Sequence, residues 1–316
     1  MKDQLVIGSR GSKLALWQAE FVRSRLAALN PLLDVRVEVV KTSGDVLKDA
    51  PLSVIGGQGA FTKELEHALL DGRIDLAVHS LKDLPTIIPA GLMLAAVAER
   101  EDPRDALVLP TSVPRVDVVS IRNLPPGAVV GTSSPRRRAQ ISHLRPDLIL
   151  KDLRGNIDTR LRKLDSGEFD ALVLAAAGLR RLGLGDRISA YVSTDELLPA
   201  VGQGALGLEA RTCDEQTVGL AARLEHTPTR AACAAERSLL RQFGAGCRVP
   251  VAAHAAVLDG RLRLEGLVAE ESGRAVLREC VEGRVIEAEG LGVRLALRLQ
   301  GRGAWLLLNG RAAQAS

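Results

Sequence analysis

Short apolar runs that end abruptly in polar residues recur along this chain and predict an α/β protein. Residues 74–78 form one such run, and residues 79–85, His-Ser-Leu-Lys-Asp-Leu-Pro, follow it. Pro85 has no backbone N–H to donate, so the chain does not continue there as a central strand. Ligands of open α/β sheets bind beyond the carboxyl ends of strands, which makes Asp83 a candidate acid or base. A solvated Lys82/Asp83 pair explains the same pattern equally well.

The first hundred residues have the pattern of one α/β unit. Ser12 is suited to cap a helix that ends at Asn30-Pro31. Residues 42–59 lack a hydrophobic period and are rich in glycine, which is typical of a lid over a site. The other predicted elements are strands at 5–8, 35–39, 74–78 and 92–98, and a helix at 62–70.

A charged segment that ends in proline, residues 99–103, predicts a domain boundary. Beyond it a second α/β set is expected, with strands at 129–130, 148–150 and 171–174 and helices at 135–144 and 157–164. Residues 198–207 cross back, so that 206–210 rejoin the first sheet. The C-terminal third has the pattern of an α+β domain, with helices at 230–243 and 286–299 around strands at 251–257, 262–268 and 275–281. The expected domains are 1–99 with 204–222, then 103–199, then 227–316.

Composition limits the class of protein. A chain of 316 residues exceeds one typical core, and 46% hydrophobic with 25% charged residues is ordinary for a globular protein. Aromatic residues are only 2%, which argues against stacking on single-stranded nucleic acid. No signal peptide or membrane span is predicted, so a cytoplasmic protein without membrane partners is expected. The four cysteines are too far apart for a zinc site or a disulfide framework, and no metal is expected.

Arginines recur where strands end and helices begin. Residues 131–134, Gly-Thr-Ser-Ser, precede Pro135 at a predicted helix start, where free backbone N–H groups favour an anion. Arg136 and Arg137 extend this pocket, although three arginines in a row are more often a solvated face. Other arginines fall at corresponding places and together suggest a cleft for a ligand with several carboxylates or phosphates. These are Arg10, Arg154, Arg160, Arg180 and Arg181.

Residues 202–207 and the segment around Cys247 contain two further motifs. Residues 202–207 match the glycine pattern of a dinucleotide site, but a strand rather than a helix is expected to follow, so that interpretation is rejected. Cys247 lies between Gly246 and Arg248, which give access to the sulfur and favour its thiolate. It is the best candidate for a reactive thiol, with ordinary packing as the alternative.

Taken together and in order, several motifs resemble the porphobilinogen deaminases, also called hydroxymethylbilane synthases. The resemblance is close over roughly the first 250 residues and weaker beyond. The motifs are Ile-Gly-Ser-Arg at 7–10, His-Ser-Leu-Lys-Asp at 79–83, Gly-Thr-Ser-Ser at 131–134, Leu-Arg-Gly-Asn at 153–156, Pro-Ala-Val-Gly-Gln-Gly-Ala at 199–205, and Gly-Cys at 246–247.

The resemblance implies a monomeric enzyme with two domains like periplasmic binding proteins and a smaller α+β domain. That third domain would carry a dipyrromethane cofactor as a thioether on Cys247. Four porphobilinogen molecules are joined head to tail on this primer, each losing ammonia, and water releases hydroxymethylbilane. Asp83 matches the family's essential aspartate, and a carboxylate suits the cationic azafulvene that forms when ammonia leaves.

Motif positions imply three sets of site residues. They are Asp83, Lys82 and Arg10 for catalysis; Cys247, Ser12, Lys82, Asp83, Thr132, Ser134, Arg136, Arg137 and Arg154 for the cofactor; and Arg10, Arg154, Arg160 and Arg181 for the substrate. The chain departs from the family pattern at Gln58, where many relatives have lysine, and at Pro135, where leucine is expected. Asp158 also makes the turn between Arg154 and Arg160 harder to anticipate.

Two other functions are compatible with parts of the sequence: binding of an anionic metabolite and binding of nucleic acid. A non-catalytic binder of an anionic metabolite would need no group on a thiol, and its intact mass would equal that of the bare sequence. A nucleic-acid binder using the arginines would lose affinity steeply with salt. The low aromatic content and the absence of a matching motif make the second the weaker hypothesis.

Overall fold

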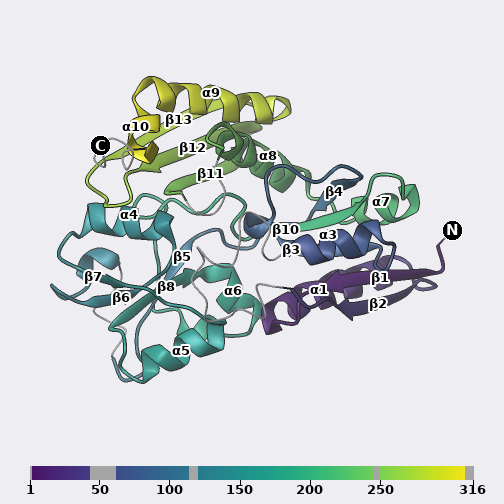
Figure 1. Cartoon of the computed structure of the whole chain (residues 1–316), viewed down its shortest axis with the longest axis horizontal. Helices are drawn as coiled ribbons and strands as arrows, with labels where there is room; N and C mark the ends of the chain where they lie inside the picture. The colour runs from purple at the N-terminus through teal and green to yellow at the C-terminus, as the bar shows by residue number, and fades with distance from the viewer. Residues whose placement is uncertain (1, 43–61, 114–119, 245–248, 310–316) are drawn as a thin grey trace. The chain divides into compact units, whose positions relative to one another are not determined.

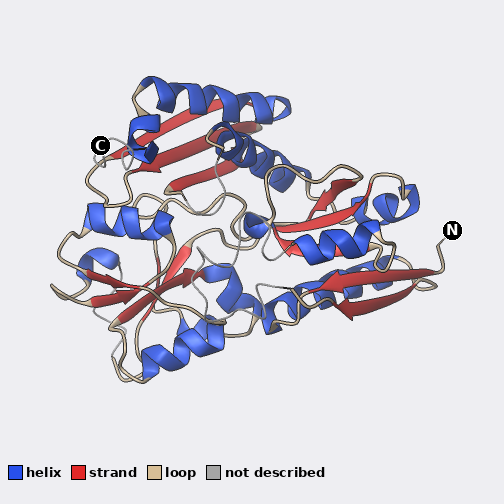
Figure 2. Ribbon diagram, viewed as in Figure 1, coloured by secondary structure: helices blue, strands red, loops and turns tan. Residues whose placement is uncertain are grey.

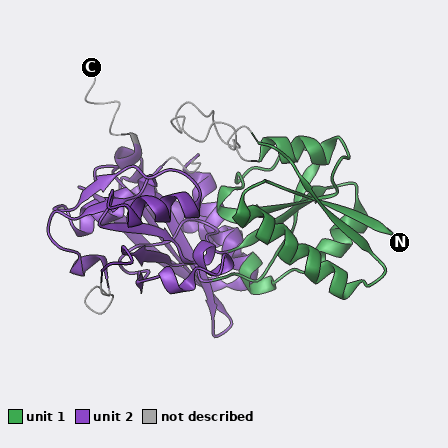
Figure 3. Ribbon diagram, turned by 90° about the horizontal axis from the view of Figure 1, so that it is seen from below, with its two compact units in different colours: residues 1–101, 205–230 green, residues 102–204, 231–316 purple. Residues whose placement is uncertain are grey.

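The computed structural model describes residues 2–42, 62–113, 120–244 and 249–309 (Figure 1). The chain forms two compact units, which are coloured separately in Figure 3. Unit 1 comprises residues 1–101 and 205–230, and unit 2 comprises residues 102–204 and 231–316. The predicted lid at 42–59, apart from Thr42, lies outside the described residues, as does Cys247.

Unit 1 is built on a five-stranded mixed sheet with the order β2-β1-β3-β10-β4. Strand β1 runs parallel to β2 and β3, whereas β10 runs antiparallel to β3 and β4. The crossing back of the chain into the first sheet is therefore confirmed. The elements are β1 (Gln4–Ser9), α1 (Lys13–Leu29), β2 (Asp34–Val39), α3 (Lys63–Leu70), β3 (Leu76–Ser80), β4 (Leu92–Val97), β10 (Leu206–Arg211) and α7 (Glu215–Ala222).

Alternating side chains of this sheet pack against helices on both of its faces. Leu76 and Val78 join the core beneath α1, to which α7 contributes Ala221. Ala77, which lies between them on β3, packs instead with Leu65 and other residues of α3. Because helices cover both faces of β3, consecutive residues of this strand are apolar instead of alternating with polar ones.

Unit 2 contains a second five-stranded mixed sheet, of order β7-β6-β8-β5-β9. Figure 2 shows α4 on one side of this sheet and α5 and α6 on the other. The elements are β5 (Asp105–Val108), β6 (Val129–Gly131), α4 (Pro135–Leu144), β7 (Ile149–Lys151), α5 (Ile157–Asp165), β8 (Ala171–Ala175), α6 (Ala176–Arg181) and β9 (Ala190–Tyr191). Strands β5 and β9 were not predicted, because each is short and lies next to proline, glycine or charged residues.

The C-terminal part of unit 2 is a three-stranded antiparallel sheet, β11-β12-β13. Its inner face packs against Leu239 of α8 and Leu295 of α9. On its other side, Ala252 and Leu267 share a core with Ala139 of α4. The elements are α8 (Thr227–Gln242), β11 (Val251–Leu258), β12 (Arg261–Ala269), β13 (Val276–Arg284), α9 (Ala288–Gly301) and α10 (Ala304–Asn309).

The predicted fold class, two α/β domains with a smaller C-terminal α+β domain, is confirmed by these three sheets. The predicted domain boundaries, including the division of unit 2 into 103–199 and 227–316, stay a prediction. Within the described residues, no helix is both long and apolar enough to cross a membrane. Over the same ranges, no group of three or more His, Cys, Asp or Glu side chains is arranged to hold a metal ion.

Candidate active site

The segment that carries Asp83 is a short 3-10 turn, Leu81–Asp83, which begins where β3 ends. Its neighbours fix it: the backbone N–H of Leu81 donates to the Ala205 carbonyl at 3.0 Å, and the side chains of Leu81 and Leu84 are buried. Lys82 is half-buried and Asp83 is exposed between these anchors. The turn therefore presents the Asp83 carboxylate at the carboxyl end of β3, where open α/β sheets bind their ligands.

A buried polar pair lies in the sheet just before this turn. His79 Nε2 lies 3.0 Å from Glu209 Oε2 on β10, and the two side chains are 3% and 0% exposed. Glu209 Oε1 is buried and finds no hydrogen-bond partner among the described residues. One residue further on, Ser80 Oγ accepts a hydrogen bond of 2.8 Å from Gln18 Nε2 of α1. The partner of His79 could not be predicted from the sequence, because Glu209 is 130 residues away.

Glu66 of α3 is a third buried titratable group in this region. Burial raises the pKa of Glu66 above its usual range, and the negative charge of Glu209 adds to the rise, while His79 opposes it. Sequence reasoning missed both Glu209 and Glu66. A single acid inside the apolar stretch 206–210 was the available signal for Glu209.

Arg10 and Ser12 follow β1 in unit 1. Ser12 caps α1, since its hydroxyl accepts a hydrogen bond of 3.2 Å from the Ala15 N–H, which confirms the predicted cap. Arg10 is half-buried in the preceding turn. Lys82, Asp83, Arg10 and Ser12 therefore all belong to unit 1, at the ends of the neighbouring strands β1 and β3.

In unit 2 the segment 131–134 joins β6 to α4, and Pro135 is the first residue of that helix. Proline suits this position, because the first helical N–H needs no partner within the helix. Thr132 is buried, and its Oγ1 accepts a hydrogen bond of 3.3 Å from the Ser134 N–H. Ser133 ties this segment to the one after β7, because its Oγ donates to the Leu153 carbonyl at 2.9 Å and accepts from the Leu153 N–H at 2.8 Å.

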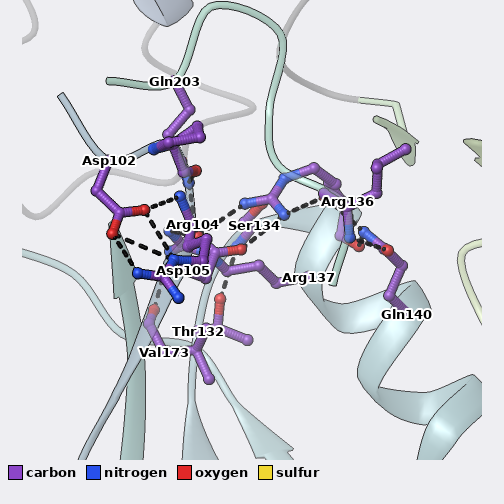
Figure 4. Close-up of polar contacts among 12 residues, drawn as sticks. Asp102, Arg104, Asp105, Thr132, Ser134, Arg136, Arg137, Gln140, Val173 and Gln203 are labelled. Carbon is purple, nitrogen blue, oxygen red and sulfur yellow. Dashed lines mark hydrogen bonds and ion pairs between the residues drawn. The ribbon is translucent and has the colours of Figure 1, made fainter. Parts of the chain in front are cut away.

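Arg136 and Arg137 are buried rather than solvated. Both guanidinium groups contact Asp105, the first residue of β5, with closest distances of 2.8 Å for Arg136 Nη1 and 2.7 Å for Arg137 Nη2 (Figure 4). Arg138, the third arginine of the run, remains part-exposed near Asp152. The solvated-face interpretation is thus wrong for the first two arginines. Asp105 was not recognised as a site residue in the sequence.

The remaining predicted arginines also lie in unit 2. Arg154 is half-buried and follows Leu153, so the Ser133 link holds it beside the start of α4. Arg160 Nε donates to the Gly155 carbonyl at 2.8 Å, and Gly155 has a φ of +103° that favours glycine. Arg181 is buried and donates from Nη2 to the Gly204 carbonyl at 2.6 Å. Arg160 lies within α5 and Arg181 is the last residue of α6, so the predicted gathering of these arginines into one cleft stays a prediction.

Comparisons with known proteins identify the family of this chain. The model "Porphobilinogen deaminase, dipyromethane cofactor binding domain" matches residues 5–219, and "Porphobilinogen deaminase, C-terminal domain" matches residues 230–301. The porphobilinogen deaminase of Syntrophotalea carbinolica is 51% identical over 300 residues, covering 95% of this chain and 93% of its own. That of Chromobacterium violaceum is 52% identical over 302 residues, covering 96% of each chain.

Solved structures are more distant. The effector binding domain of BenM with benzoate is 17% identical, with a TM-score of 0.42, and the match covers 76% of this chain and 93% of that domain. Substrate binding domain 2 of Lactococcus lactis GlnP is 12% identical, with a TM-score of 0.43, and the match covers 77% of this chain and 91% of that domain. These likenesses support no argument about function. The family models span most of the chain and the relatives align along nearly their whole length, so the chain belongs to the porphobilinogen deaminase family.

Proposed function

We propose that this chain joins four porphobilinogen molecules head to tail, with loss of ammonia at each step, and releases hydroxymethylbilane by hydrolysis. Membership of the family establishes deaminase activity in tetrapyrrole biosynthesis and a dipyrromethane cofactor. The observation that carries the proposed residue roles is the exposed Asp83 carboxylate on a turn anchored by buried leucines. Family membership also removes the reason to prefer a non-catalytic binder or a nucleic-acid binder.

Asp83 is proposed to act on the departing ammonia. A carboxylate that accepts a hydrogen bond from the substrate's aminomethyl group stabilises the ammonium form, and it also stabilises the cation that remains after ammonia leaves. The turn supplies this group without further rearrangement, because Leu81 and Leu84 are already buried on either side. Lys82 and Arg10 are proposed to bind carboxylates of the reacting pyrrole.

The arginine cluster of unit 2 fits a cofactor that carries several carboxylates. Two guanidinium groups face one carboxylate, that of Asp105, which leaves one positive charge in excess. Arg136 Nε is buried and has no hydrogen-bond partner in the part of the chain that the structure describes. When bound, the dipyrromethane supplies the pyrrole carbon to which the first substrate is joined. Arg136, Arg137, Arg154, Thr132 and Ser134 are proposed to hold its acetate and propionate groups.

Binding of the substrate's carboxylates is assigned to Arg154, Arg160 and Arg181 together with Arg10. Each guanidinium suits a carboxylate because it offers two parallel N–H donors. The growing product multiplies these carboxylates, so several arginines at neighbouring strand ends are useful. We further propose that the protein is a cytoplasmic monomer.

Attachment of the cofactor to Cys247 as a thioether is also a proposal, supported by the Gly-Cys motif. The described thiols differ in access, since Cys213 is exposed, Cys233 is buried and Cys280 is half-buried. The intact mass of freshly purified protein tests the assignment. Wild-type protein is expected to exceed its sequence mass by two linked pyrroles, as is the Cys213→Ser control, whereas Cys247→Ser is expected to have the bare sequence mass. A cofactor still present in Cys247→Ser would move the attachment to another thiol.

Turnover of Asp83→Asn tests the catalytic assignment. We expect this variant to fold and to keep the cofactor mass while losing nearly all production of hydroxymethylbilane, because the amide carries no negative charge to stabilise the cation. Asp71→Asn, which changes another exposed carboxylate of unit 1, is the matched control and is expected to remain active. Near-normal turnover of Asp83→Asn would remove Asp83 from its proposed role.

A further inference from the structure

Asp105 is the carboxylate that binds both arginines of the cluster in unit 2, Arg136 and Arg137. Its Oδ1 accepts hydrogen bonds from Arg137 Nη2 at 2.7 Å, Gln203 Nε2 at 2.9 Å, Arg137 Nε at 3.1 Å and Arg136 Nη2 at 3.3 Å. Its Oδ2 accepts from Arg136 Nη1 at 2.8 Å. The Asp105 side chain is fully buried, and those of Arg136 and Arg137 are 5% and 7% exposed. Asp105 accepts from both guanidinium groups, so it couples the orientation of Arg136 to that of Arg137.

Each of the two arginines also donates a hydrogen bond to a backbone carbonyl. Arg136 Nη1 also donates to the Leu198 carbonyl at 2.8 Å, and Arg137 Nη1 donates to the Val173 carbonyl at 2.9 Å. Gln140 supports the first contact, since its Oε1 accepts from the Leu198 N–H at 2.8 Å. Each guanidinium is therefore held by a carbonyl on one side and by Asp105 on the other.

The cluster contains two guanidinium groups, those of Arg136 and Arg137, and one carboxylate, that of Asp105. Burial alone would raise the pKa of Asp105, but Arg136 and Arg137 outweigh it and hold that pKa well below its usual range. Burial lowers the pKa of Arg136, and the positive charge of Arg137 adds to the decrease, whereas Asp105 opposes it. An ionised Asp105 thus cancels one of two buried positive charges. An anionic group that approaches the cluster still finds one positive charge to pair with.

Gln203 connects this cluster to the segments where the chain enters and leaves unit 2. Its side-chain Nε2 donates both to Asp105 and, at 2.8 Å, to the Pro103 carbonyl. Residues 102 and 204 are the ends of the first stretch of unit 2. The next residue, Gly204, accepts from Arg181, which is itself a predicted substrate-binding arginine. Asp105 is thereby connected to Arg181 through two hydrogen bonds and the backbone between Gln203 and Gly204.

We propose that Asp105 is a positioning residue for the reaction: it fixes the orientation of Arg136 and Arg137 and leaves one excess positive charge for a carboxylate of the dipyrromethane. Gln203 holds Asp105 in turn. This inference rests on the proposed assignment of Arg136 and Arg137 to the cofactor. Asp105 itself makes no contact with the cofactor in this scheme.

The test compares Asp105→Asn, Gln203→Leu and Arg137→Gln in the full-length protein. Asp165→Asn is the matched control, because Asp165 also pairs with an arginine of unit 2, Arg187, but at the surface. Folded protein is isolated by size-exclusion chromatography, and intact mass gives the fraction of folded chains that carry dipyrromethane. Turnover is then expressed per loaded chain. A merely structural role for Asp105 would reduce the yield of folded protein without changing either quantity.

For Asp105→Asn we expect a lower loaded fraction and a fall of about tenfold or more in kcat/KM per loaded chain, about 1.4 kcal/mol, the size of one charge-assisted hydrogen bond. Gln203→Leu should reduce kcat/KM by about threefold or more, and Asp165→Asn should match wild type. Wild-type loading and kcat/KM in folded Asp105→Asn would overturn the inference. If that variant does not fold, wild-type values in Gln203→Leu would overturn it.

Arg137→Gln separates the inference from the function on which it rests. Reduced loading in Arg137→Gln together with wild-type behaviour of Asp105→Asn would overturn the positioning role alone. Full loading and turnover in Arg137→Gln would instead overturn the proposed cofactor contacts of this arginine. Equal losses in Asp105→Asn and in the Asp165→Asn control would also count against the positioning role, because the control carboxylate lies outside the cluster.

Discussion

The buried His79–Glu209 pair gives a stability prediction that follows directly from the geometry. The two side chains are 3% and 0% exposed and join neighbouring strands β3 and β10 immediately before the Asp83 turn. Glu209 Oε1 already lacks a partner among the described residues, so His79→Leu would leave both oxygens of a buried carboxyl group without a hydrogen bond. Glu209→Leu would instead leave the His79 ring without its acceptor.

The size of each effect can be estimated. Removing one partner of a buried pair typically costs about 3–5 kcal/mol, a large part of a total stability of about 5–15 kcal/mol. Replacing both partners by apolar side chains of similar size is often nearly neutral, because no polar group remains unpaired. The double variant His79→Leu/Glu209→Leu should therefore be more stable than either single variant, with a coupling free energy above about 3 kcal/mol, because the two single costs disappear together.

Urea unfolding of wild type, both single variants and the double variant measures this coupling. The surface pair Arg23–Glu20 on α1, with side chains 39% and 54% exposed, provides a matched cycle. Its coupling should be much weaker than that of the buried pair, as for other exposed helical pairs. Additive single effects at His79 and Glu209, or a double variant less stable than both singles, would refute the claim that the cost comes from unpaired buried groups.

Two further predictions concern Glu66 and the packing of α9. Because the pKa of Glu66 is raised in the folded state, its stabilising contribution is present below the unfolded-state pKa and is lost as the pH rises through the folded-state value. Glu66→Gln should therefore have a higher melting temperature than wild type at neutral pH, and this difference should shrink as the pH falls; a difference independent of pH would contradict this reasoning. A methyl group on Gly292 would lie 2.4 Å from the Ala235 carbonyl oxygen, whereas one on Gly290 would meet nothing within 4 Å. In thermal unfolding we expect Gly292→Ala to destabilise by about 1–3 kcal/mol and Gly290→Ala to stabilise by about 0.5–1 kcal/mol, and equal shifts would argue against close packing of α8 and α9.

The sequence predicted the sheets and the Asp83 turn because their signals are local. An apolar run such as residues 74–78 and the proline that follows it specify a strand and its end within a dozen residues. The sequence could not show which arginines of the run 136–138 are buried. That depends on Asp105, which is 31 residues from Arg136 and is brought to it only when β5 pairs into the sheet.

Residues 105–109 do carry a weak signal, an acid directly before four apolar residues. Without a partner in view, that acid is indistinguishable from a loop residue at the start of a strand. The partner of His79 was hidden in the same way, by a separation of 130 residues. Local patterns thus predict elements and exposed candidate groups such as Asp83, while the buried charges near them depend on contacts distant in sequence.

The two units bury different sets of titratable side chains. In unit 1, the acids Glu66 and Glu209 lie with one imidazole, His79, in the sheet that carries Asp83. In unit 2, one acid, Asp105, faces two guanidinium groups at the start of α4. An excess of acids suits a unit whose proposed task is to stabilise a cation, and an excess of guanidinium groups suits one that holds carboxylates. Buried groups are poorly screened by salt, so this difference persists at physiological ionic strength. The proposed division of labour between Asp83 and the arginines is consistent with these buried groups.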